Sequence, residues 1–200
     1  MSLGGLANMC RTFQDIRAQI NLGIVPTELG EAEIYIDRKT SSRDSKADLG
    51  KHQLGCQIKQ SKISHVMYIN QLKNLDFIPN LTGIITADTC KGPSVDVSVL
   101  KHIDWLFVSD DEVSNLDDIV DNIKGSVIIH SPEGSRIVGQ NNLQCYNESL
   151  LVENANVLGA GDMFASCFLY AIHNQMTVES AISYAHRTTS RLIGKYNEKI

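Results

Sequence analysis

The feature that most constrains the fold is an alternation of short apolar segments with helical or turn-rich segments through the middle of the chain. Each apolar segment is only a few residues long and rich in β-branched side chains, which is typical of buried strands. We expect strands over residues 65–69, 83–87, 105–108, 126–130, 135–138 and 143–146. A helix is expected over residues 116–123. Short strands that alternate with helices form a largely parallel sheet covered by helices, so the sequence predicts an α/β fold.

The two ends of the chain are predicted to be mainly helical. One helix is expected over residues 6–20, after a turn at Gly4-Gly5, and two more over residues 162–174 and 177–196. The first of the two C-terminal helices repeats apolar side chains at helical spacing. This spacing predicts one buried face.

Residues 31–51 differ in character from the rest of the chain. A strand expected over residues 32–37 leads into a stretch with an excess of Lys and Arg over Asp, including Arg38, Lys39 and Arg43. One interpretation is a solvated loop with a surface helix, and the other is a mobile flap over an anionic ligand. The sequence leaves both interpretations open.

Composition excludes several classes of function. The net charge of −5 argues against a nucleic-acid binder that works by neutralising phosphates. No apolar run is long enough to span a bilayer and the start of the chain lacks a signal peptide pattern, so we expect no membrane partner. The 5 cysteines are scattered without metal-ligand spacing, which favours a reducing cytoplasm. At 200 residues, we expect a single domain over residues 1–200.

Acidic residues gather between residues 104 and 121 without any Lys or Arg. We interpret most of them as a solvated helix face, and only Glu112, directly after a predicted strand, as a functional candidate. Asp88 also follows a predicted strand and is expected at the carboxyl edge of the sheet, where open α/β folds bind ligands. Four histidines lack metal-ligand spacing and are expected in the core or at the surface: His65, His102, His173 and His186.

The clearest chemistry lies in Leu158-Gly159-Ala160-Gly161-Asp162, where a glycine-bearing loop enters an amphipathic helix. Backbone amides of such a loop, at the positive end of a helix dipole, form an anion site. Asp162 is placed to accept a proton from a hydroxyl that attacks a phosphoryl group. An aspartate at a helix start can equally serve as a cap, so local chemistry leaves both roles open.

The segment from Asn156 to Asp162, followed by Phe164 and an apolar helix, resembles the C-terminal signature of the ribokinase-like (PfkB) carbohydrate kinases. The resemblance implies a three-layer sandwich, with a mostly parallel central sheet flanked by helices and a small β lid. It also implies that Gly159, Ala160 and Gly161 form an anion hole and that Asp162 is the catalytic base. Other segments follow the family's order along nearly the whole chain, although only the GAGD part is highly specific.

The same resemblance assigns the acceptor side of the site. Gly4-Gly5-Leu6-Ala7-Asn8 is similar to the family's GG-x-x-N element, which implies that Gly4, Gly5 and Asn8 contact the sugar. Residues 33–43 resemble the strand and polar turn of the family's lid, expected here within residues 31–51.

The nucleotide side is assigned in the same way. Residues 105–112 resemble the family's strand that ends in N-x-x-E, which implies that Glu112 helps to organise Mg²⁺ near the phosphates. Residues 128–134 lie where the family has a T-x-G-x-x-G turn. The resemblance therefore implies an ATP site contacted by Ser109, His130, Gly134 and Asn156.

The chain also departs from the family pattern. Ser109 replaces the usual Asn, His130 the usual Thr, Pro132 the usual first Gly and Asn156 a frequent Asp. The family's opening strand pair, with its sugar-binding Asp, has no counterpart, and family members are longer. The sequence could therefore belong to a natural minimal member or lack stretches of a longer chain.

Two functional hypotheses follow from the resemblance and its departures. The first is a cytoplasmic kinase that uses ATP and Mg²⁺ to phosphorylate a hydroxyl of a small sugar or nucleoside, as a homodimer formed through the lid. The second is a catalytically weakened binding or regulatory protein, motivated by the altered residues Ser109 and His130.

Overall fold

The central sheet of the computed structural model contains six strands in the order β3-β4-β5-β6-β7-β8. Strands β3 to β6 are parallel, and β7 and β8 continue the sheet in antiparallel fashion. The strands are β3 Ile63–Val66, β4 Ile84–Asp88, β5 Trp105–Ser109, β6 Ser126–His130, β7 Gly134–Gly139 and β8 Tyr146–Glu148. The structure describes residues 4–18, 32–34, 41–43, 61–112, 114–139, 146–150, 152 and 155–197. The predicted mostly parallel α/β fold is confirmed.

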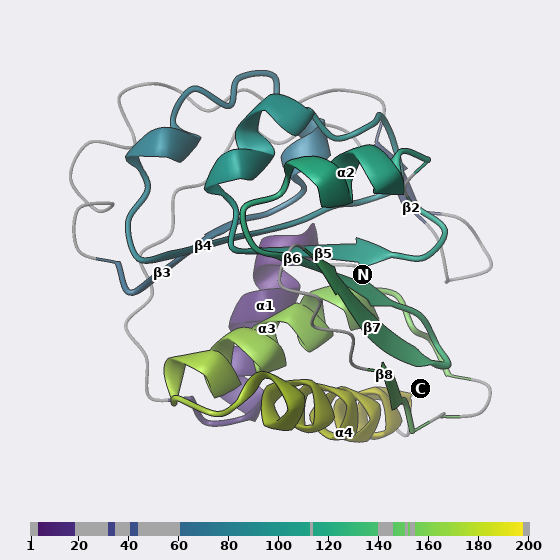
Figure 1. Cartoon of the computed structure of the whole chain (residues 1–200). Coiled ribbons are helices and arrows are strands. Elements are labelled where there is room, and N and C mark those ends of the chain that lie inside the picture. Colours follow the sequence, from purple (N-terminus) through teal and green to yellow (C-terminus); the bar gives the residue numbers. More distant parts are fainter. Residues whose placement is uncertain are drawn as a thin grey trace.

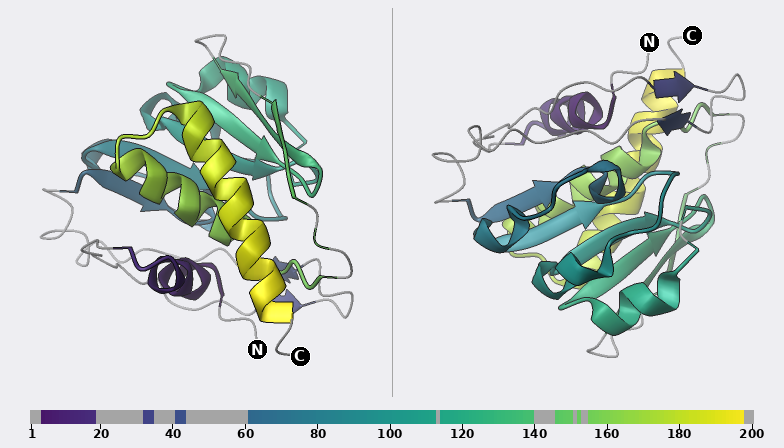
Figure 2. Two further views of the ribbon diagram at one scale, coloured as in Figure 1. Left: turned by 90° about the horizontal axis from the view of Figure 1, so that it is seen from below. Right: turned by 90° about the horizontal axis from the view of Figure 1, so that it is seen from above.

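Helices cover both faces of this sheet and complete a three-layer arrangement (Figure 1). One face carries α1 (Gly4–Asp15), α3 (Ala160–His173) and α4 (Val178–Asn197). The opposite face carries α2 (Leu116–Asn122) and the 3₁₀ helix η4 (Val97–His102). Figure 2 shows α3 and α4 side by side, and α3 also packs against α1.

Strand β5 shows why the sheet needs cover on both faces. Leu106 and Val108 join the apolar core beneath α2 and η4, whereas Phe107 joins the core formed with α3 and α4. Successive side chains of a strand point to opposite faces, so an apolar run must be buried on both sides. Each of these three side chains is at most 1% exposed.

A separate two-stranded antiparallel sheet lies within the predicted lid segment. It consists of β1 (Ala32–Ile34) and β2 (Ser41–Arg43). The strand expected from residue 32 is therefore present over its first residues. The other residues of the 31–51 segment, including Arg38 and Lys39, lie outside the described residues, so the lid itself stays a prediction.

Several element boundaries differ from those expected. Helix α1 begins at Gly4, so the expected turn at Gly4-Gly5 is wrong and both glycines are helical. Strand β3 spans Ile63–Val66 instead of residues 65–69, because Tyr68 adopts a left-handed conformation with φ of 52° and opens the 3₁₀ helix η2 (Ile69–Gln71). Strand β8 at Tyr146–Glu148 lies further along the chain than residues 143–146.

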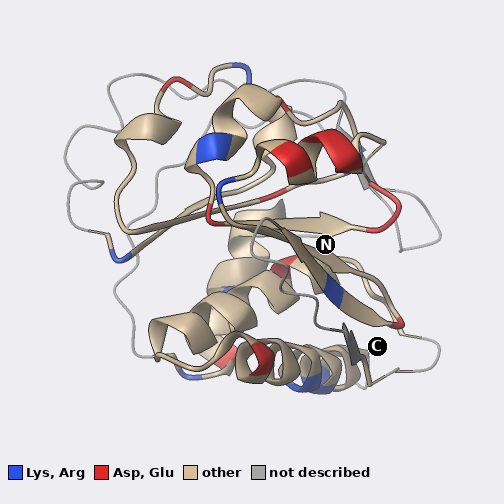
Figure 3. Ribbon diagram, in the orientation of Figure 1, with Lys and Arg blue, Asp and Glu red and all other residues tan. Residues whose placement is uncertain are grey.

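Helix α2 is rich in acidic residues, as Figure 3 shows. Asp117, Asp118 and Asp121 are exposed there, so the predicted solvated helix face is confirmed. Within the described ranges, no helix is both long and apolar enough to cross a membrane.

Candidate functional site

Parallel strands and the N-terminus of α3 meet at one edge of the sheet. Asp88 ends β4, Ser109 ends β5 and His130 ends β6. Helix α3 brings Asp162 to this edge in its first turn, and the Asp162 carboxylate there contacts Tyr68, just beyond β3. The carboxyl edge of a parallel sheet is where such folds hold their ligands.

The side chain of Asp162 is buried, with only 6% of its residue surface exposed. Its Oδ2 accepts a hydrogen bond from Asn8 Nδ2 at 2.7 Å, and its Oδ1 accepts one from the Tyr68 hydroxyl at 3.0 Å. A buried carboxylate needs such donors because its charge is otherwise poorly solvated. The predicted residues Asn8 and Asp162 are therefore in direct contact.

Burial and, to a smaller extent, the charge of Asp88 raise the pKa of Asp162, and its net value is about 6. The hydrogen bonds from Asn8 and Tyr68 and the nearby His65 act in the opposite direction. A carboxyl group with such a pKa is mostly ionised at neutral pH and is a stronger base than an exposed aspartate. These are the properties required of a general base.

The loop before α3 leads into a helix start whose first backbone amides are only partly bonded within the described residues. Gly159 has a φ of 84°, in the left-handed region, and a Cβ there would come within 2.5 Å of Asn8 Nδ2. The Ala160 amide donates to Val157 O at 2.9 Å and the Met163 amide to Gly159 O at 3.1 Å. The amides of Gly161 and Asp162 between them find no acceptor among the described residues. These two amides can therefore bind an anion.

His130 lies directly beside this loop. A Cβ on Gly161 would be 3.1 Å from His130 Cε1, and the His130 ring lies 5.6 Å from that of Phe164. Desolvation lowers the pKa of His130 to about 4, so its imidazole is neutral at pH 7. A neutral imidazole still offers one N–H donor to a phosphate oxygen.

Ser109 and Glu112 are also brought together. Glu112 Oε2 accepts hydrogen bonds from the Thr89 hydroxyl at 3.0 Å and from the Ser109 amide at 3.3 Å. Burial raises the pKa of Glu112 to about 7, and the charges of Asp111 and Asp88 add to this effect. Asp88 thus acts on both Glu112 and Asp162.

The Glu112 carboxylate is a suitable ligand for a magnesium ion that is bound mainly by phosphates and water. A cation beside Glu112 would favour its ionised form, which burial disfavours. The described residues hold no cluster of three or more metal-ligating side chains. Mg²⁺ often uses only one or two carboxylates together with substrate phosphates, so one carboxylate at this edge is compatible with it.

The other residues that the sequence assigned to the site contribute to backbone structure and packing. Gly4 opens α1, and Gly5 packs so closely that a Cβ would lie 2.4 Å from the Tyr68 hydroxyl oxygen. Gly134 exchanges backbone hydrogen bonds with Ser131 in the turn before β7. The Asn156 side chain accepts from the Leu158 amide at 3.1 Å and so shapes the loop that leads to Gly159.

Two residues of the site carry no sequence signal of their own. Tyr68 contacts Asp162 from a position 94 residues earlier in the chain. His65, which we expected to be a core or surface histidine, lies 3.3 Å from Asp88 Oδ2 and 2.8 Å from the Thr86 hydroxyl. Their positions follow from strand pairing, because His65 faces Thr86 in the parallel register of β3 and β4.

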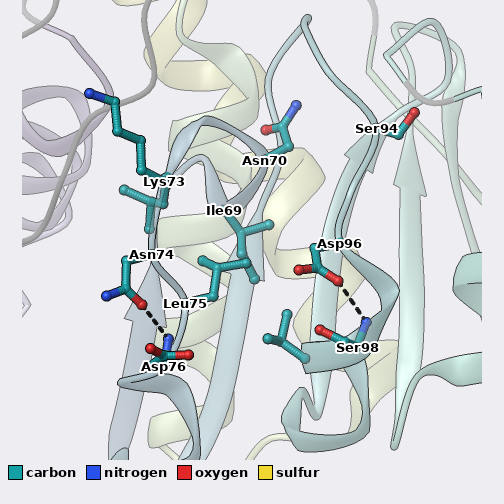
Figure 4. A pocket seen from close by; sticks show the side chains of 11 residues that line it. Ile69, Asn70, Lys73, Asn74, Leu75, Asp76, Ser94, Asp96 and Ser98 are labelled. Atoms are coloured by element: carbon teal, nitrogen blue, oxygen red, sulfur yellow. Dashed lines mark hydrogen bonds between the residues drawn. The ribbon is translucent and has the colours of Figure 1, made fainter.

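A cavity of about 460 Å³ lies in the loops that follow β3 and β4 (Figure 4). Its polar lining includes Asn70, Lys73, Asn74, Asp76, Asp96 and Ser98. Asn74 and Asp96 each accept a backbone amide two residues ahead, at 2.9 Å, which stabilises local turns. None of the predicted site residues lines this cavity.

Several solved structures with a similar fold are kinases. A ribokinase from Thermotoga maritima shares 17% identity at a TM-score of 0.56, over 66% of this chain and 49% of its own. A pyrophosphate-dependent kinase in the ribokinase family shares 15% identity at a TM-score of 0.61, over 76% of this chain and 65% of its own. A nucleoside kinase from Burkholderia thailandensis shares 18% identity at a TM-score of 0.56, over 69% of this chain and 52% of its own.

These likenesses show the fold, and the chain spans about half to two thirds of the length of those structures. No curated protein sequence matches the chain. The sequence model of the pfkB family carbohydrate kinases matches residues 24–199 and so covers most of the chain, including the GAGD loop and α3. On this match, together with the shared fold, the chain belongs to the pfkB family of carbohydrate kinases.

Proposed function

We propose that this chain transfers the γ-phosphoryl group of ATP to a hydroxyl group of a small sugar or nucleoside. The observation that carries the proposal is Asp162, a buried carboxylate next to two available amides at the carboxyl edge of the sheet. Membership in a family of carbohydrate kinases supports the same class of reaction.

In the proposed reaction, Asp162 accepts the proton of the acceptor hydroxyl. The hydroxyl oxygen forms a bond to the γ-phosphorus while the bond from that phosphorus to its bridging oxygen breaks, which releases ADP. The raised pKa of Asp162, about 6, suits this step because a more basic carboxylate accepts a proton more readily.

The amides of Gly161 and Asp162 would stabilise the negative charge on the transferred group. Gly159 would support them through its left-handed backbone, which turns the loop at the start of α3. The Ala160 amide is already bonded to Val157 O, so we assign Ala160 no direct contact with the phosphate. His130 would add a neutral N–H donor beside Gly161.

Glu112 would hold Mg²⁺ at the phosphates, and Ser109, whose amide bonds Glu112, would offer its hydroxyl to a water of that ion. Bound Mg²⁺ would neutralise charge on the phosphate oxygens during transfer. Thr89 fixes the orientation of Glu112 through its hydroxyl. Contacts of Gly134 and Asn156 with the nucleotide stay predictions.

The acceptor would lie on the Asn8 side of Asp162. Asn8 bonds Asp162 and can also meet a sugar hydroxyl, since its side chain carries both donors and an acceptor. We expect the cytoplasm as the location and a homodimer through the lid. The described cysteines, Cys10, Cys90 and Cys167, are free thiols, which agrees with a reducing compartment.

The direct test is Asp162→Asn, assayed with a panel of sugars and nucleosides. ATP, GTP and pyrophosphate are each offered as phosphoryl donors with Mg²⁺. We expect a substrate of the wild-type protein to be found, and we expect the variant to lose kcat by roughly 10²-fold or more, as general-base removal does. Donor affinity, measured by calorimetry, should change little.

Asp76→Asn is the matched control, because Asp76 is exposed and is not among the groups that bond Asp162 or shift its pKa. Turnover of Asp162→Asn at the wild-type rate would remove Asp162 from the mechanism. A folded wild-type protein that binds no donor and turns over no acceptor would instead favour the binding or regulatory protein.

A further inference from the structure

Each carboxylate oxygen of Asp162 accepts a hydrogen bond, and the two donors come from different elements. Asn8 comes from α1, which is a helix that packs on α3. Tyr68 comes from the segment after β3 and is itself fixed at two further points. These two points set Tyr68 apart from an incidental neighbour.

The first point is the Tyr68 backbone. Its amide donates to Asp88 Oδ1, and its φ of 52° lies in the left-handed region, which non-glycine residues rarely adopt. Asp88 is fixed in turn, because its Oδ2 lies 3.3 Å from His65 Nε2 and only 6% of the residue is exposed.

The second point is the Tyr68 ring. The ring packs against Gly5 of α1 so closely that any Cβ at position 5 would overlap the phenol. Burial and the charge of Asp162 strongly raise the pKa of Tyr68, so its hydroxyl remains a proton donor at all working pH values. The hydroxyl is therefore a fixed donor aimed at Asp162 Oδ1.

We propose that Tyr68 is a positioning residue for the general base: its hydroxyl orients the Asp162 carboxylate and favours the ionised form. This inference rests on the proposed role of Asp162. The titratable groups around Asp162 are Asp88, His65 and Tyr68, with His130 beside the neighbouring Gly161. Among these, Asp88 disfavours the charge on Asp162, while Tyr68 and His65 favour it.

Tyr68→Phe removes the hydroxyl and keeps the ring that packs on Gly5. Loss of the donor should raise the pKa of Asp162, so the acid limb of the kcat profile should move to higher pH by about one unit. The rate should then fall about fivefold at pH 6 and less than twofold at pH 8, with KM nearly unchanged. A purely structural role for Tyr68 would lower the rate equally at all pH values.

A substrate-free measurement keeps this inference separate from the proposed function. The carboxyl ¹³C signal of Asp162, assigned by comparison with Asp162→Asn, is titrated in wild type and in Tyr68→Phe. We expect the midpoint to rise by about one pH unit in the variant. This titration tests the role of Tyr68 even if the protein turns over no acceptor. The kinase proposal fails separately, if the folded wild-type protein shows no turnover.

Asp88→Asn should shift the Asp162 midpoint in the opposite direction. The substitution removes a negative charge but keeps an oxygen for the Tyr68 amide, so the Asp162 midpoint should fall. Tyr170→Phe is the matched control, since Tyr170 lies later in the same helix and pairs with Tyr184. It should leave the midpoint unchanged.

Equal midpoints in wild type and Tyr68→Phe would overturn the proposal. So would an acid limb that moves as far in Tyr170→Phe. If Tyr68→Phe fails to fold, 3-fluorotyrosine introduced at position 68 provides the test. Its more acidic phenol should donate more strongly and lower the Asp162 midpoint, and an unchanged or raised midpoint would again contradict the role of Tyr68.

Discussion

Asp162 meets two opposing demands. A general base must be able to ionise, but the Asp162 carboxyl group is buried and close to Asp88, and both conditions disfavour its charge. The donors Asn8 and Tyr68 only partly offset this penalty, because the pKa remains raised, at about 6. The folded state is therefore destabilised by the ionised form of this residue.

Asp162→Asn should consequently stabilise the protein. The folded-state pKa of about 6 lies above the ordinary value of 3.8, so the ionised carboxylate destabilises the fold above pH 6. That penalty shrinks as the pH falls through 6 and vanishes below about 3.8. We expect the variant to gain roughly 2 kcal/mol in the free energy of unfolding at pH 7.

Urea unfolding between pH 4 and pH 8 measures this gain, with Asp76→Asn as the exposed control. The amide oxygen introduced at position 162 can still accept from Tyr68, and the Asn8 amide can flip to match it. A loss of stability at pH 7, or a gain that does not depend on pH, would contradict this account.

Asp162 could be predicted from sequence, but Tyr68 could not. The GAGD pattern is local, because the loop, the helix start and the acid are consecutive residues. The Tyr68 contact depends on where a strand ends and on a partner 94 residues away, and a lone tyrosine after an apolar run carries no mark of either. Asn8 became a candidate only through the family resemblance.

At the scale of elements, α1 is joined to α4 by side-chain contacts in addition to its packing on α3. The Asp15 carboxylate accepts from Lys195 Nζ at 2.6 Å and from the Tyr196 hydroxyl. Arg11 also lies 3.8 Å from the centre of the Tyr196 ring. Since α1 carries Asn8, this attachment holds one side of the candidate site.

Asp15→Asn tests that attachment. Burial raises the pKa of Asp15, but the hydrogen bonds and charges of Lys195, Tyr196 and Arg11 outweigh it and leave a net pKa below 3.8. A lowered pKa stabilises the fold at pH values above 3.8, and this contribution is lost as the pH falls through the folded-state value. We expect the variant to lose about 1 kcal/mol at pH 7, because a partly exposed ion-pair network contributes little more.

Urea titrations at pH 7 and near pH 3 give the required comparison. The difference in the free energy of unfolding between variant and wild type should become smaller at the lower pH, because Asp15 of the wild type loses its charge there by protonation. Lys195→Met should reproduce most of the loss at pH 7, since it removes the nearest cationic partner of Asp15. An Asp15→Asn variant as stable as wild type would mean that apolar packing alone holds α1.

The existence of most elements could be predicted, whereas their ends often could not. The apolar run around β3 continues into Ile69, yet the strand stops at Val66 because Asp88 captures the Tyr68 amide and the chain turns. Two glycines suggested a turn before α1, but Gly5 serves as space for the Tyr68 ring within the helix. Both boundaries are set by tertiary contacts that a local pattern does not contain.

At the scale of the molecule, one sheet serves two apolar cores. Ile119 of α2 lies in the core on one face, and Ile182 of α4 lies in the core on the other. The sole tryptophan, Trp105, packs against the second core with its ring 5.5 Å from that of Phe168. Because strands such as β5 contribute to both cores, we expect the two to unfold together.

Trp105 fluorescence and far-UV circular dichroism should therefore report the same urea midpoint. Ile119→Val and Ile182→Val should each lower both midpoints together, by an amount equivalent to about 1 kcal/mol. A fluorescence midpoint that ignores Ile119→Val while circular dichroism follows it would show that the two faces unfold separately. That outcome would also contradict the prediction of a single domain.

The fold class was within reach of the sequence because it depends on repeated signals that reinforce one another. Strand after strand, such as residues 105–108 and 126–130, shows the same apolar pattern between helices. The acceptor specificity was not within reach, because the side chains that would select an acceptor come from distant elements, as Asn8 of α1 beside Asp162 of α3 does.

The two hydrogen bonds on Asp162 join parts of the chain that a ribosome makes far apart in time. Asn8 is synthesised 154 residues before its partner and Tyr68 94 residues before it. Helix α4, which anchors α1 through Lys195, emerges later still. A growing chain therefore cannot assemble the surroundings of Asp162 until Asp162 itself, at the start of α3, has been translated. The proposed phosphoryl transfer is therefore expected only from a chain that has been translated beyond α3.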